Sequence, residues 1–322
     1  MRLLSVIFSL GMLAAACAKE PIEEGGSGGR SGSGGTTSNG GKSGSGGKSG
    51  SGGKSGSGGT KNTGGSQPPA SVDCQDNSTF SGFVADQYGS INISVDGNSS
   101  KSYTMMANWW GKPYNDQTET ISGIGFTMTN PGNVTTSAPH TPMGFPTIFI
   151  GSYQNKTTKG SNLPKQISSL TSVPTVFSTN SESIGWSGYN AAYDVWLTKS
   201  SSPLGGSATS PGSGGAYLMV WLFKTTDEQP RGDQIVAGRE VPGVPGAWTV
   251  WVDESNPSCV SYVSSKKLSS LEFDLNAFLQ DAVKNQYGNI TDSQYLSVIF
   301  AGFEVWGGGD GLQVKRFCAN VK

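Results

Sequence analysis

Histidine and charged residues are scarce in this chain of 322 residues. The one histidine, His140, lies in the turn-rich stretch "SAPHTPMG", where a solvated side chain is the ordinary outcome. Ser-His-Asp and Cys-His catalysis and histidine-rich metal sites all require a positioned imidazole, so the sequence argues against them. Charged residues make up 14% of the chain, and the formal net charge is -1. Because nucleic-acid binding depends on many basic contacts to phosphates, we expect no nucleic-acid partner.

Cysteines are also few and widely spaced, at Cys17, Cys74, Cys259 and Cys318. None stands in the Cys-x-x-Cys spacing of a zinc site, so we expect neither a metal ion nor a cofactor. Cys17 belongs to the N-terminal segment, which leaves three cysteines for the rest of the chain. We expect one disulfide bond among these three and one buried thiol, and the sequence does not decide the pairing.

The apolar run "LLSVIFSLGMLAAA", behind the positive charge of Arg2, is too short to span a bilayer as a mature helix. It is typical of an export signal, which we assign to residues 1–18. Lipidation of Cys17 would anchor the protein at a bacterial cell surface or outer membrane, whereas cleavage between small residues would release a secreted protein. We favour lipidation because a tether follows and a tether needs an anchor. Membrane contact is expected only through that lipid.

Residues 19–70 carry much of the glycine. The stretch "GGKSGSGGKSGSGGKSGSGG" repeats six residues and has no apolar side chain to bury, so we expect a disordered linker. If residues 25–66 form a Gly/Ser random coil, their r.m.s. reach is on the order of 35 Å. Pro68 and Pro69 stiffen the chain and mark a boundary. The sequence therefore predicts a folded domain over 71–322.

Most of that domain shows the period-two pattern of β-strands. The candidate strands are "SINISV", "SYTMMANWW", "TIFIGSY", "AAYDVWLT", "YLMVWLF", "AWTVWV", "CVSYVS", "YLSVIFAGFEVW" and "LQVKRF". One segment, "SLEFDLNAFLQDAVKNQYG", has apolar residues at helical spacing from Leu275 to Val283, and Gly288 is a natural stop. Many strands and one helix predict an all-β fold, a two-sheet sandwich of the jelly-roll kind.

Aromatic residues and two isolated acids indicate sugar chemistry. Eight tryptophans and a low charge suit a neutral ligand with flat apolar faces, although an aromatic β-core would have the same composition. Cleaving a sugar polymer takes two carboxylates around one bond. Asp194 in "AAYDVWLT" and Glu304 in "FAGFEVWGG" are both flanked by aromatic residues, which raise a carboxyl pKa by excluding water. The alternative is that each is a rim residue or a hydrogen-bonded structural carboxylate.

Four segments in order, "NWWG", "AAYDVWL", "YLMVWL" and "FEVWGG", resemble glycoside hydrolase family 12, the small endoglucanases (cellulases) and xyloglucanases. "AWTVWV", the Ser-Tyr-Val strand and the single helix match the later half of the same family. The resemblance runs from about residue 74 to the end of the chain. It implies a concanavalin-like, two-sheet jelly roll, a substrate cleft on the concave face, and retaining cleavage of β-1,4-glucans.

The resemblance also implies roles for individual residues. Glu304 would be the general acid/base, and Asp194 the carboxylate that hydrogen-bonds the nucleophile. Substrate contacts would come from Asn108, Trp110, Met219, Trp221 and Trp306. Two positions depart from the family: Tyr217 stands where the family has its nucleophilic glutamate, and Val305 replaces a proline after the acid/base.

A phenol with a pKa near 10 is a poor nucleophile at neutral pH. The sequence therefore favours an exported protein that recognises a β-1,4-glucan (cellulose, xyloglucan or mixed-linkage glucan) without hydrolysing it. The alternative is an active endo-β-1,4-glucanase or xyloglucanase with altered machinery, using Tyr217 as nucleophile or Asp194 to activate water. A third interpretation is a structural surface protein that binds no sugar.

Overall fold

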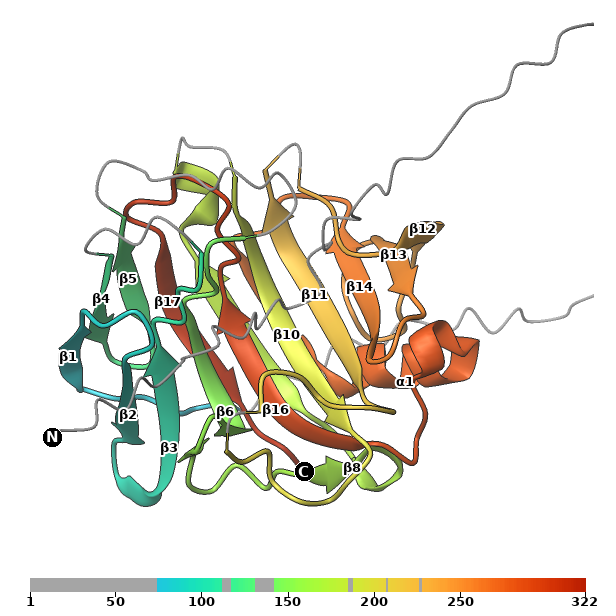
Figure 1. Ribbon diagram of the computed structural model, residues 1–322, viewed down its shortest axis with the longest axis horizontal. Helices are drawn as coiled ribbons and strands as arrows, with labels where there is room; N and C mark the ends of the chain where they lie inside the picture. Colours follow the sequence, from blue (N-terminus) through green and yellow to red (C-terminus); the bar gives the residue numbers. More distant parts are fainter. Residues whose placement is uncertain (1–73, 112–116, 131–141, 185–187, 207, 226–227) are drawn as a thin grey trace, which may run out of the picture. The chain divides into compact units, whose positions relative to one another are not determined.

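The computed structural model describes residues 74–111, 117–130, 142–184, 188–206, 208–225 and 228–322. The predicted export signal, Cys17, the linker and His140 lie outside these ranges. No helix in the described ranges is long and apolar enough to cross a membrane. The folded domain consists of two β-sheets and one α-helix, which confirms the predicted all-β jelly roll (Figure 1).

The smaller sheet has six strands. In spatial order they are β1 (Ser81–Val84), β4 (Thr118–Ser122), β5 (Phe126–Thr129), β17 (Gln313–Ala319), β9 (Pro174–Thr179) and β15 (Ser270–Asp274). Only β17 was among the predicted strands. The others are short or rich in serine and threonine, so their alternation is weak and their pairing across the sheet defines them.

The larger sheet has eleven strands. Its main order is β12 (Asp233–Arg239), β13 (Trp248–Asp253), β14 (Ser258–Ser264), β11 (Ala216–Lys224), β10 (Asn190–Thr198), β16 (Tyr295–Gly302), β6 (Thr147–Tyr153), β3 (Asn98–Met106) and β2 (Ser90–Val95). The two-residue strands β7 (Lys156–Thr157) and β8 (Lys165–Gln166) pair with β6 and β16, respectively. Figure 1 shows β6, β16, β10 and β11 side by side in the middle of this sheet.

Strand β11 separates the two faces of the larger sheet. Leu218, Val220 and Leu222 belong to the core between the sheets, together with side chains of the smaller sheet. The alternate residues Tyr217 and Trp221 belong to a second, aromatic cluster whose members all come from the larger sheet and the segments that flank its strands. This cluster therefore lies on the face turned away from the smaller sheet, which we call the outer face.

The helical segment is shorter than its pattern suggests. Helix α1 covers Asn276–Asn285, and the residues before it form β15, with Leu271 and Phe273 buried in alternation. Strand pairing with β9 prevails there over the helical spacing. Gln286 adopts the left-handed conformation that ends the helix, two residues before the expected glycine. Phe278 fixes α1 on the sheet by packing against Trp248 at 4.9 Å. Short 3-10 turns occupy Ile167–Ser169, Ser181–Ser183 and Tyr287–Asn289.

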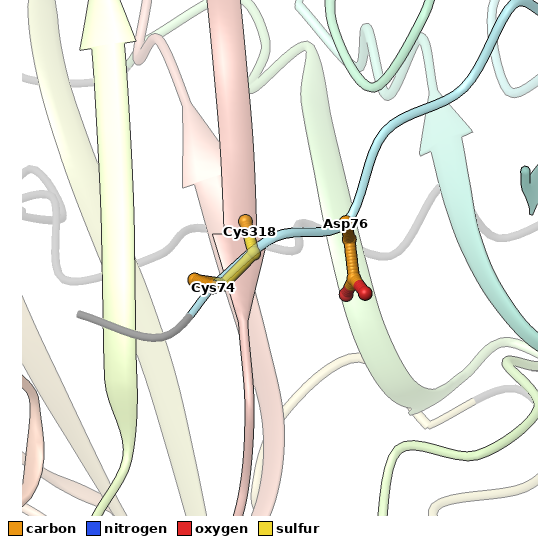
Figure 2. Close-up of side chains that lie close together, drawn as sticks. All are labelled: Cys74, Asp76 and Cys318. Carbon is orange, nitrogen blue, oxygen red and sulfur yellow. A yellow bond between two sulfur atoms is a disulfide. The ribbon is translucent and has the colours of Figure 1, made fainter.

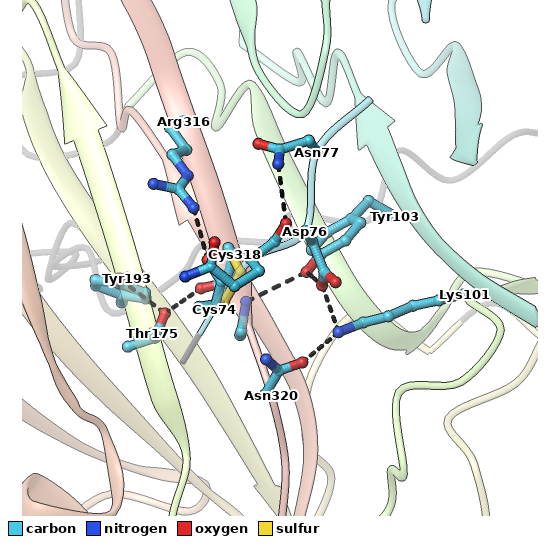
Figure 3. The surroundings of a disulfide bond; sticks show 12 residues. Cys74, Asp76, Asn77, Lys101, Tyr103, Thr175, Tyr193, Arg316, Cys318 and Asn320 are labelled. Carbon is cyan, nitrogen blue, oxygen red and sulfur yellow. Dashed lines mark hydrogen bonds and ion pairs between the residues drawn. A yellow bond between two sulfur atoms is a disulfide. The ribbon is translucent and has the colours of Figure 1, made fainter. Parts of the chain in front are cut away.

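A disulfide bond joins Cys74, at the start of the domain, to Cys318 on β17 (Figure 3). Arg316 donates a hydrogen bond to the Cys74 carbonyl at 2.6 Å, and Thr175 donates to the Cys318 carbonyl at 2.7 Å. Cys259 is buried on β14 and is not a free thiol, so the expected unpaired thiol is wrong.

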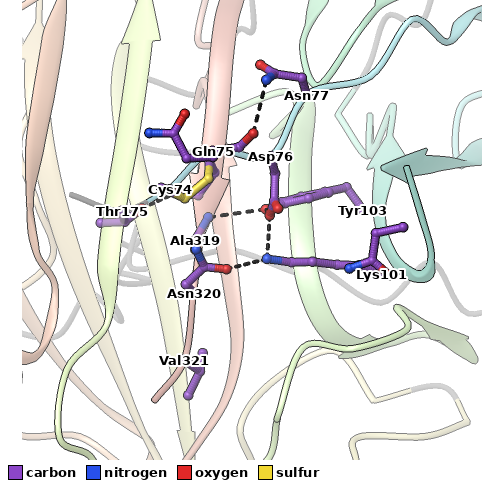
Figure 4. A network of polar contacts seen from close by, with 12 residues as sticks. Cys74, Gln75, Asp76, Asn77, Lys101, Tyr103, Thr175, Ala319, Asn320 and Val321 are labelled. Carbon is purple, nitrogen blue, oxygen red and sulfur yellow. Dashed lines mark hydrogen bonds and ion pairs between the residues drawn. A yellow bond between two sulfur atoms is a disulfide. The ribbon is translucent and has the colours of Figure 1, made fainter. Parts of the chain in front are cut away.

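A polar network continues from this disulfide. Asp76 forms an ion pair with Lys101 and accepts a hydrogen bond from Tyr103, while Lys101 also donates to Asn320 (Figure 4). The carboxylate of Asp76 lies close to the two sulfur atoms (Figure 2). Sulfur atoms in a disulfide have no thiolate to offer a metal, so this group is a structural clamp between the two ends of the domain.

Candidate functional site

Strands β10 and β11 place four of the predicted site residues on the outer face: Asp194, Tyr217, Met219 and Trp221. In their antiparallel register Asp194 lies opposite Met219, and Trp196 lies opposite Tyr217. Asp194 is therefore the diagonal neighbour of Tyr217 on the same face, within reach of long side chains. On its other side Asp194 pairs with Phe300 of β16, so the carboxyl group stands in the middle of the sheet among aromatic residues.

Asp194 is buried and incompletely bonded. Its Oδ2 accepts a hydrogen bond from Trp196 Nε1 at 2.8 Å, while Oδ1 has no partner within the described structure. Burial raises the pKa of Asp194 to about 7, and the Trp196 hydrogen bond opposes that rise. The group is thus protonated in part of the population at neutral pH, which suits a carboxyl that donates a hydrogen bond to a neighbouring anion.

Glu304 lies two residues beyond the end of β16 and is held by Asn190, the first residue of β10. The Glu304 backbone N–H donates to Asn190 Oδ1 at 2.9 Å, and the Asn190 side-chain amide donates to Glu304 Oε2. Oε1 of Glu304 has no partner in the described residues. Burial raises the pKa of Glu304 well above its usual value, and the nearby charge of Asp194 raises it further. A carboxyl with a raised pKa fits a general acid.

Tyr217 is 4% exposed, and its ring packs edge-on against Trp196 at 5.5 Å. Burial and then the charge of Asp194 raise the pKa of the Tyr217 phenol above its usual range, while Arg231 and a hydrogen bond with Ser210 oppose the rise. The phenol is therefore neutral at physiological pH. Asp194 is electrostatically coupled both to Glu304 and to Tyr217, so the three predicted residues do meet at one site.

Arg231 is a site residue that sequence reasoning missed. Arg231 lies between the end of β11 and the start of β12. Strand β12 starts beside Val252, which lies near the beginning of β11 and not near its end, so the connection runs back along the sheet. The Arg231 guanidinium lies 5.9 Å from the centroid of the Tyr217 ring and forms an ion pair with Asp253. It also donates to the Pro257 carbonyl at 2.9 Å. Neither spacing nor pattern links an arginine in this loop to a tyrosine on another element.

The segment "NWWG" turns sharply after β3. Asn108 has a φ of 52°, a left-handed conformation that costs free energy for a residue with a side chain. Trp109 points into the core, where its Nε1 donates to Glu119 at 2.7 Å, and burial raises the pKa of Glu119 to about 8. Trp110 instead packs against the aromatic cluster of the outer face. Glu119 is a second residue that the sequence did not single out.

Backbone bridges bring the segments around the site together. Gly144 pairs with Trp109 on one side and with Val305 on the other, and Val305 also pairs with Tyr189. Asn108 and Glu304 therefore approach each other across residues 143–145. On the far side of Glu304, the ring of Trp306 lies 6.4 Å from that of Trp221 on β11.

The site contains buried polar atoms without partners. Within the described residues there are eight such side-chain atoms, and five belong to predicted site residues: Asn108 Oδ1, Trp110 Nε1, Asp194 Oδ1, Trp221 Nε1 and Glu304 Oε1. Folded proteins pair the great majority of their buried polar groups. A group of unpaired donors and acceptors among aromatic rings is therefore suited to a ligand that supplies hydroxyl groups and flat apolar faces. Met219, also fully buried, contributes only apolar surface.

The buried carboxyl of Asp194 leads to a pH-dependent prediction. Its pKa is 3.8 in an unperturbed chain and about 7 in the folded protein, so the folded state binds the proton more tightly. Stability should then fall as pH rises from about 4 to about 7. Asp194→Asn removes this penalty, and we expect it to be about 1–3 kcal/mol more stable than wild type at pH 8.

Urea unfolding of both proteins at pH 4, 6 and 8 measures the difference. It should be largest at pH 8 and small at pH 4. The same difference at all three pH values would show that folding does not shift the pKa of Asp194.

Comparisons with known proteins agree with this geometry. The sequence model of Glycosyl hydrolase family 12 matches residues 101–322. The chain is similar to the probable cellulase Cel12b of Mycobacterium tuberculosis (strain ATCC 25618 / H37Rv), with 31% identity over 164 residues, 50% of this chain and 99% of that protein. It is also similar to the probable xyloglucan-specific endo-beta-1,4-glucanase A of Aspergillus terreus (strain NIH 2624 / FGSC A1156), with 29% identity over 167 residues, 49% of this chain and 59% of that protein.

Among solved structures, endoglucanase cel12A from Rhodothermus marinus superposes with a TM-score of 0.63 at 27% identity, covering 74% of this chain and 98% of that chain. The same assignment follows from the shared fold, from the matched region of the sequence and from the order of the segments around Asp194 and Glu304. The chain belongs to glycosyl hydrolase family 12.

Proposed function

We propose that this protein recognises β-1,4-glucans through the outer face of its larger sheet and hydrolyses them poorly or not at all. The observation that carries the binding half is the group of unpaired buried polar atoms among the aromatic rings of the site. Sugar hydroxyls can pair with such atoms, and pyranose faces can stack on tryptophan. The family assignment supports a glucan as the ligand, because the similar proteins are named cellulases and endoglucanases.

The proposed loss of hydrolysis rests on Tyr217. A retaining mechanism needs a carboxylate at this position to form the glycosyl-enzyme intermediate. Strand β11 has no acidic residue from Ala216 to Lys224, and burial keeps the Tyr217 phenol protonated. Glu304 retains the raised pKa of a general acid. The site thus keeps an acid and sugar contacts but has no competent nucleophile.

An active endo-β-1,4-glucanase with altered machinery is the alternative. Its support is the coupling between Asp194 and Glu304, because an inverting enzyme pairs an acid with a second carboxylate that activates water. Release of reducing ends from soluble β-glucans by the wild-type protein, abolished in Glu304→Gln, would favour this alternative over the binding function.

We also propose export, with lipidation at Cys17 and a flexible tether as the favoured form. The disulfide Cys74–Cys318 supports export, because such bonds persist in oxidising compartments. Cell fractionation of wild type and Cys17→Ala tests the anchor: wild type should be found with membranes, and the variant should be soluble. Wild type in the soluble fraction would favour the freely secreted form.

Glucan binding should depend on Trp110 and Trp221. Stacking of a flat ligand on an aromatic face contributes on the order of 1–3 kcal/mol per ring, so Trp110→Ala and Trp221→Ala should each weaken binding by about 5- to 150-fold. Affinity electrophoresis in gels with hydroxyethyl cellulose, xyloglucan or mixed-linkage β-glucan measures the dissociation constants.

Phe83→Ala is a matched control, because Phe83 is 59% exposed on β1 of the smaller sheet. It should migrate like wild type. Wild-type protein that is not retarded by any of the three glucans would contradict the proposed function.

A further inference from the structure

A pocket of about 220 Å³ opens at the end of β11, beyond the carboxyl groups of the site. It is lined by Trp221, Phe223, Lys224, Thr225 and residues 263–267. Trp221 and Val263 pair across β11 and β14 and both belong to the aromatic cluster of the outer face. The pocket is therefore continuous with the site. It is smaller than the roughly 300–1,000 Å³ of an ordinary ligand cavity and is sized for one sugar unit or substituent.

The pocket lies on the opposite side of Glu304 from Asn108 and Trp110. Backbone bridges place residues 108–110 next to 143–145, and 143–145 next to 304–306. Tyr189, just before β10, pairs with Val305 on the other side. Tyr189 stacks on Phe223 with ring centroids 5.7 Å apart, and Phe223 lines the pocket. A glucan chain that contacts Trp110 and passes Glu304 would therefore reach the pocket with the sugar units that follow.

The chemistry of the pocket combines an aromatic floor with positive charge. Trp221 is fully buried, and its indole N–H has no hydrogen-bond partner in the described residues. Lys267 Nζ lies 5.2 Å from the centroid of the Phe223 ring, and Lys266 is exposed beside it. Neither Lys266 nor Lys267 has an acidic partner within 4 Å among the described residues. These features together suit a sugar unit that carries a negative charge.

A carboxylate lies near the opposite wall. Thr225 donates a hydrogen bond to Glu228, which places a carboxylate behind that wall. Lys266 and Lys267 outnumber it among the described side chains nearest the pocket. A bound anion should therefore lie on the side of residues 263–267, away from Thr225.

We propose that this pocket is a subsite for a carboxylate-bearing unit of a β-1,4-glucan chain, with Lys266 and Lys267 as its specificity-determining residues. Glucose acquires a carboxylate by oxidation at C6, which gives a uronic acid within the chain, or at C1, which gives an aldonic acid at the chain end. The uronic acid keeps its pyranose ring, whereas the aldonic acid is an open chain linked to the next pyranose, and both carry one carboxylate. The inference rests on the proposed glucan-binding function and adds a preference for oxidised glucan.

Calorimetric titration of the full mature protein tests the preference. The three probes are cellotetraose, its C1-oxidised aldonic acid and a cello-oligosaccharide with a C6-oxidised unit. At 50 mM NaCl we expect the better acidic probe to bind about five-fold more tightly than cellotetraose, in line with one or two exposed charge pairs. At 1 M NaCl, where the Debye length is about 3 Å, the preference should disappear. The acid that is preferred identifies the source of the charge.

Lys266→Gln with Lys267→Gln should remove the preference, so that the variant binds the acidic probes no more tightly than cellotetraose. Lys315→Gln is the control, because Lys315 is exposed on β17 of the smaller sheet. Equal binding of acidic and neutral probes by wild type, or a preference that survives in the double variant, would overturn the subsite and leave the proposed function intact. Failure to bind any probe would instead contradict the proposed function itself.

Discussion

Tyr217→Glu should hydrolyse β-1,4-glucans at a rate on the order of 10³-fold above the wild-type protein, equivalent to about 4 kcal/mol of transition-state stabilisation. The substitution returns a carboxylate to a position diagonal to Asp194 and on the same site as Glu304. Asp194, with a pKa of about 7, can donate a hydrogen bond to the new carboxylate. The Arg231 guanidinium above position 217 would favour its ionised form.

Reducing-end release from carboxymethyl cellulose and xyloglucan measures the gain. Tyr217→Gln is the matched control, because glutamine has the shape of glutamate without the charge, and it should stay as inactive as wild type. Adding Glu304→Gln to the Tyr217→Glu variant should abolish the new activity. A different set of results would contradict the proposal: wild type hydrolyses the glucans, Glu304→Gln abolishes that hydrolysis, and Tyr217→Glu does not increase it. The protein would then be an active enzyme that does not need a carboxylate at position 217.

Loss of the Cys74–Cys318 bond should produce the largest change in stability. The bond closes a loop with a sequence separation of 244, and cross-links over long loops contribute about 3–5 kcal/mol. The double variant Cys74→Ser with Cys318→Ser should therefore unfold at a melting temperature lower by about 6–20 °C, given roughly 2–4 °C per kcal/mol for a domain of this size. Calorimetry of the oxidised proteins measures the shift.

The single variants provide the control. Cys74→Ser and Cys318→Ser break the same bond, so each should lower the melting temperature about as much as the double variant, and the effects should not add. Glucan binding should persist below the new melting temperature, because the bond lies on the smaller-sheet strand β17 and not on the outer face. A double variant that melts like wild type would show that the polar network around Asp76 holds the two ends of the domain by itself.

The sequence by itself determined the two faces of β11 and singled out the carboxyl groups of Asp194 and Glu304. Alternation is a local property of an extended chain, since successive side chains point to opposite sides. The pattern of Tyr217, Met219 and Trp221 against their neighbours therefore predicted which residues share a face. Asp194 and Glu304 could be singled out because aromatic neighbours in the sequence lie close to them in space as well.

Only the tertiary structure decided how these groups are held. Asn190 and Glu304 are 114 positions apart, and they meet because β10 and β16 pair in one register. Arg231 reaches Tyr217 through a connection whose path depends on where β12 joins the sheet, and Glu119 meets Trp109 inside the core. The pocket beside Lys267 exists because β11 and β14 run parallel and end together. Contacts of this kind depend on strand order and register, which arise from packing over the whole domain and not from any local pattern.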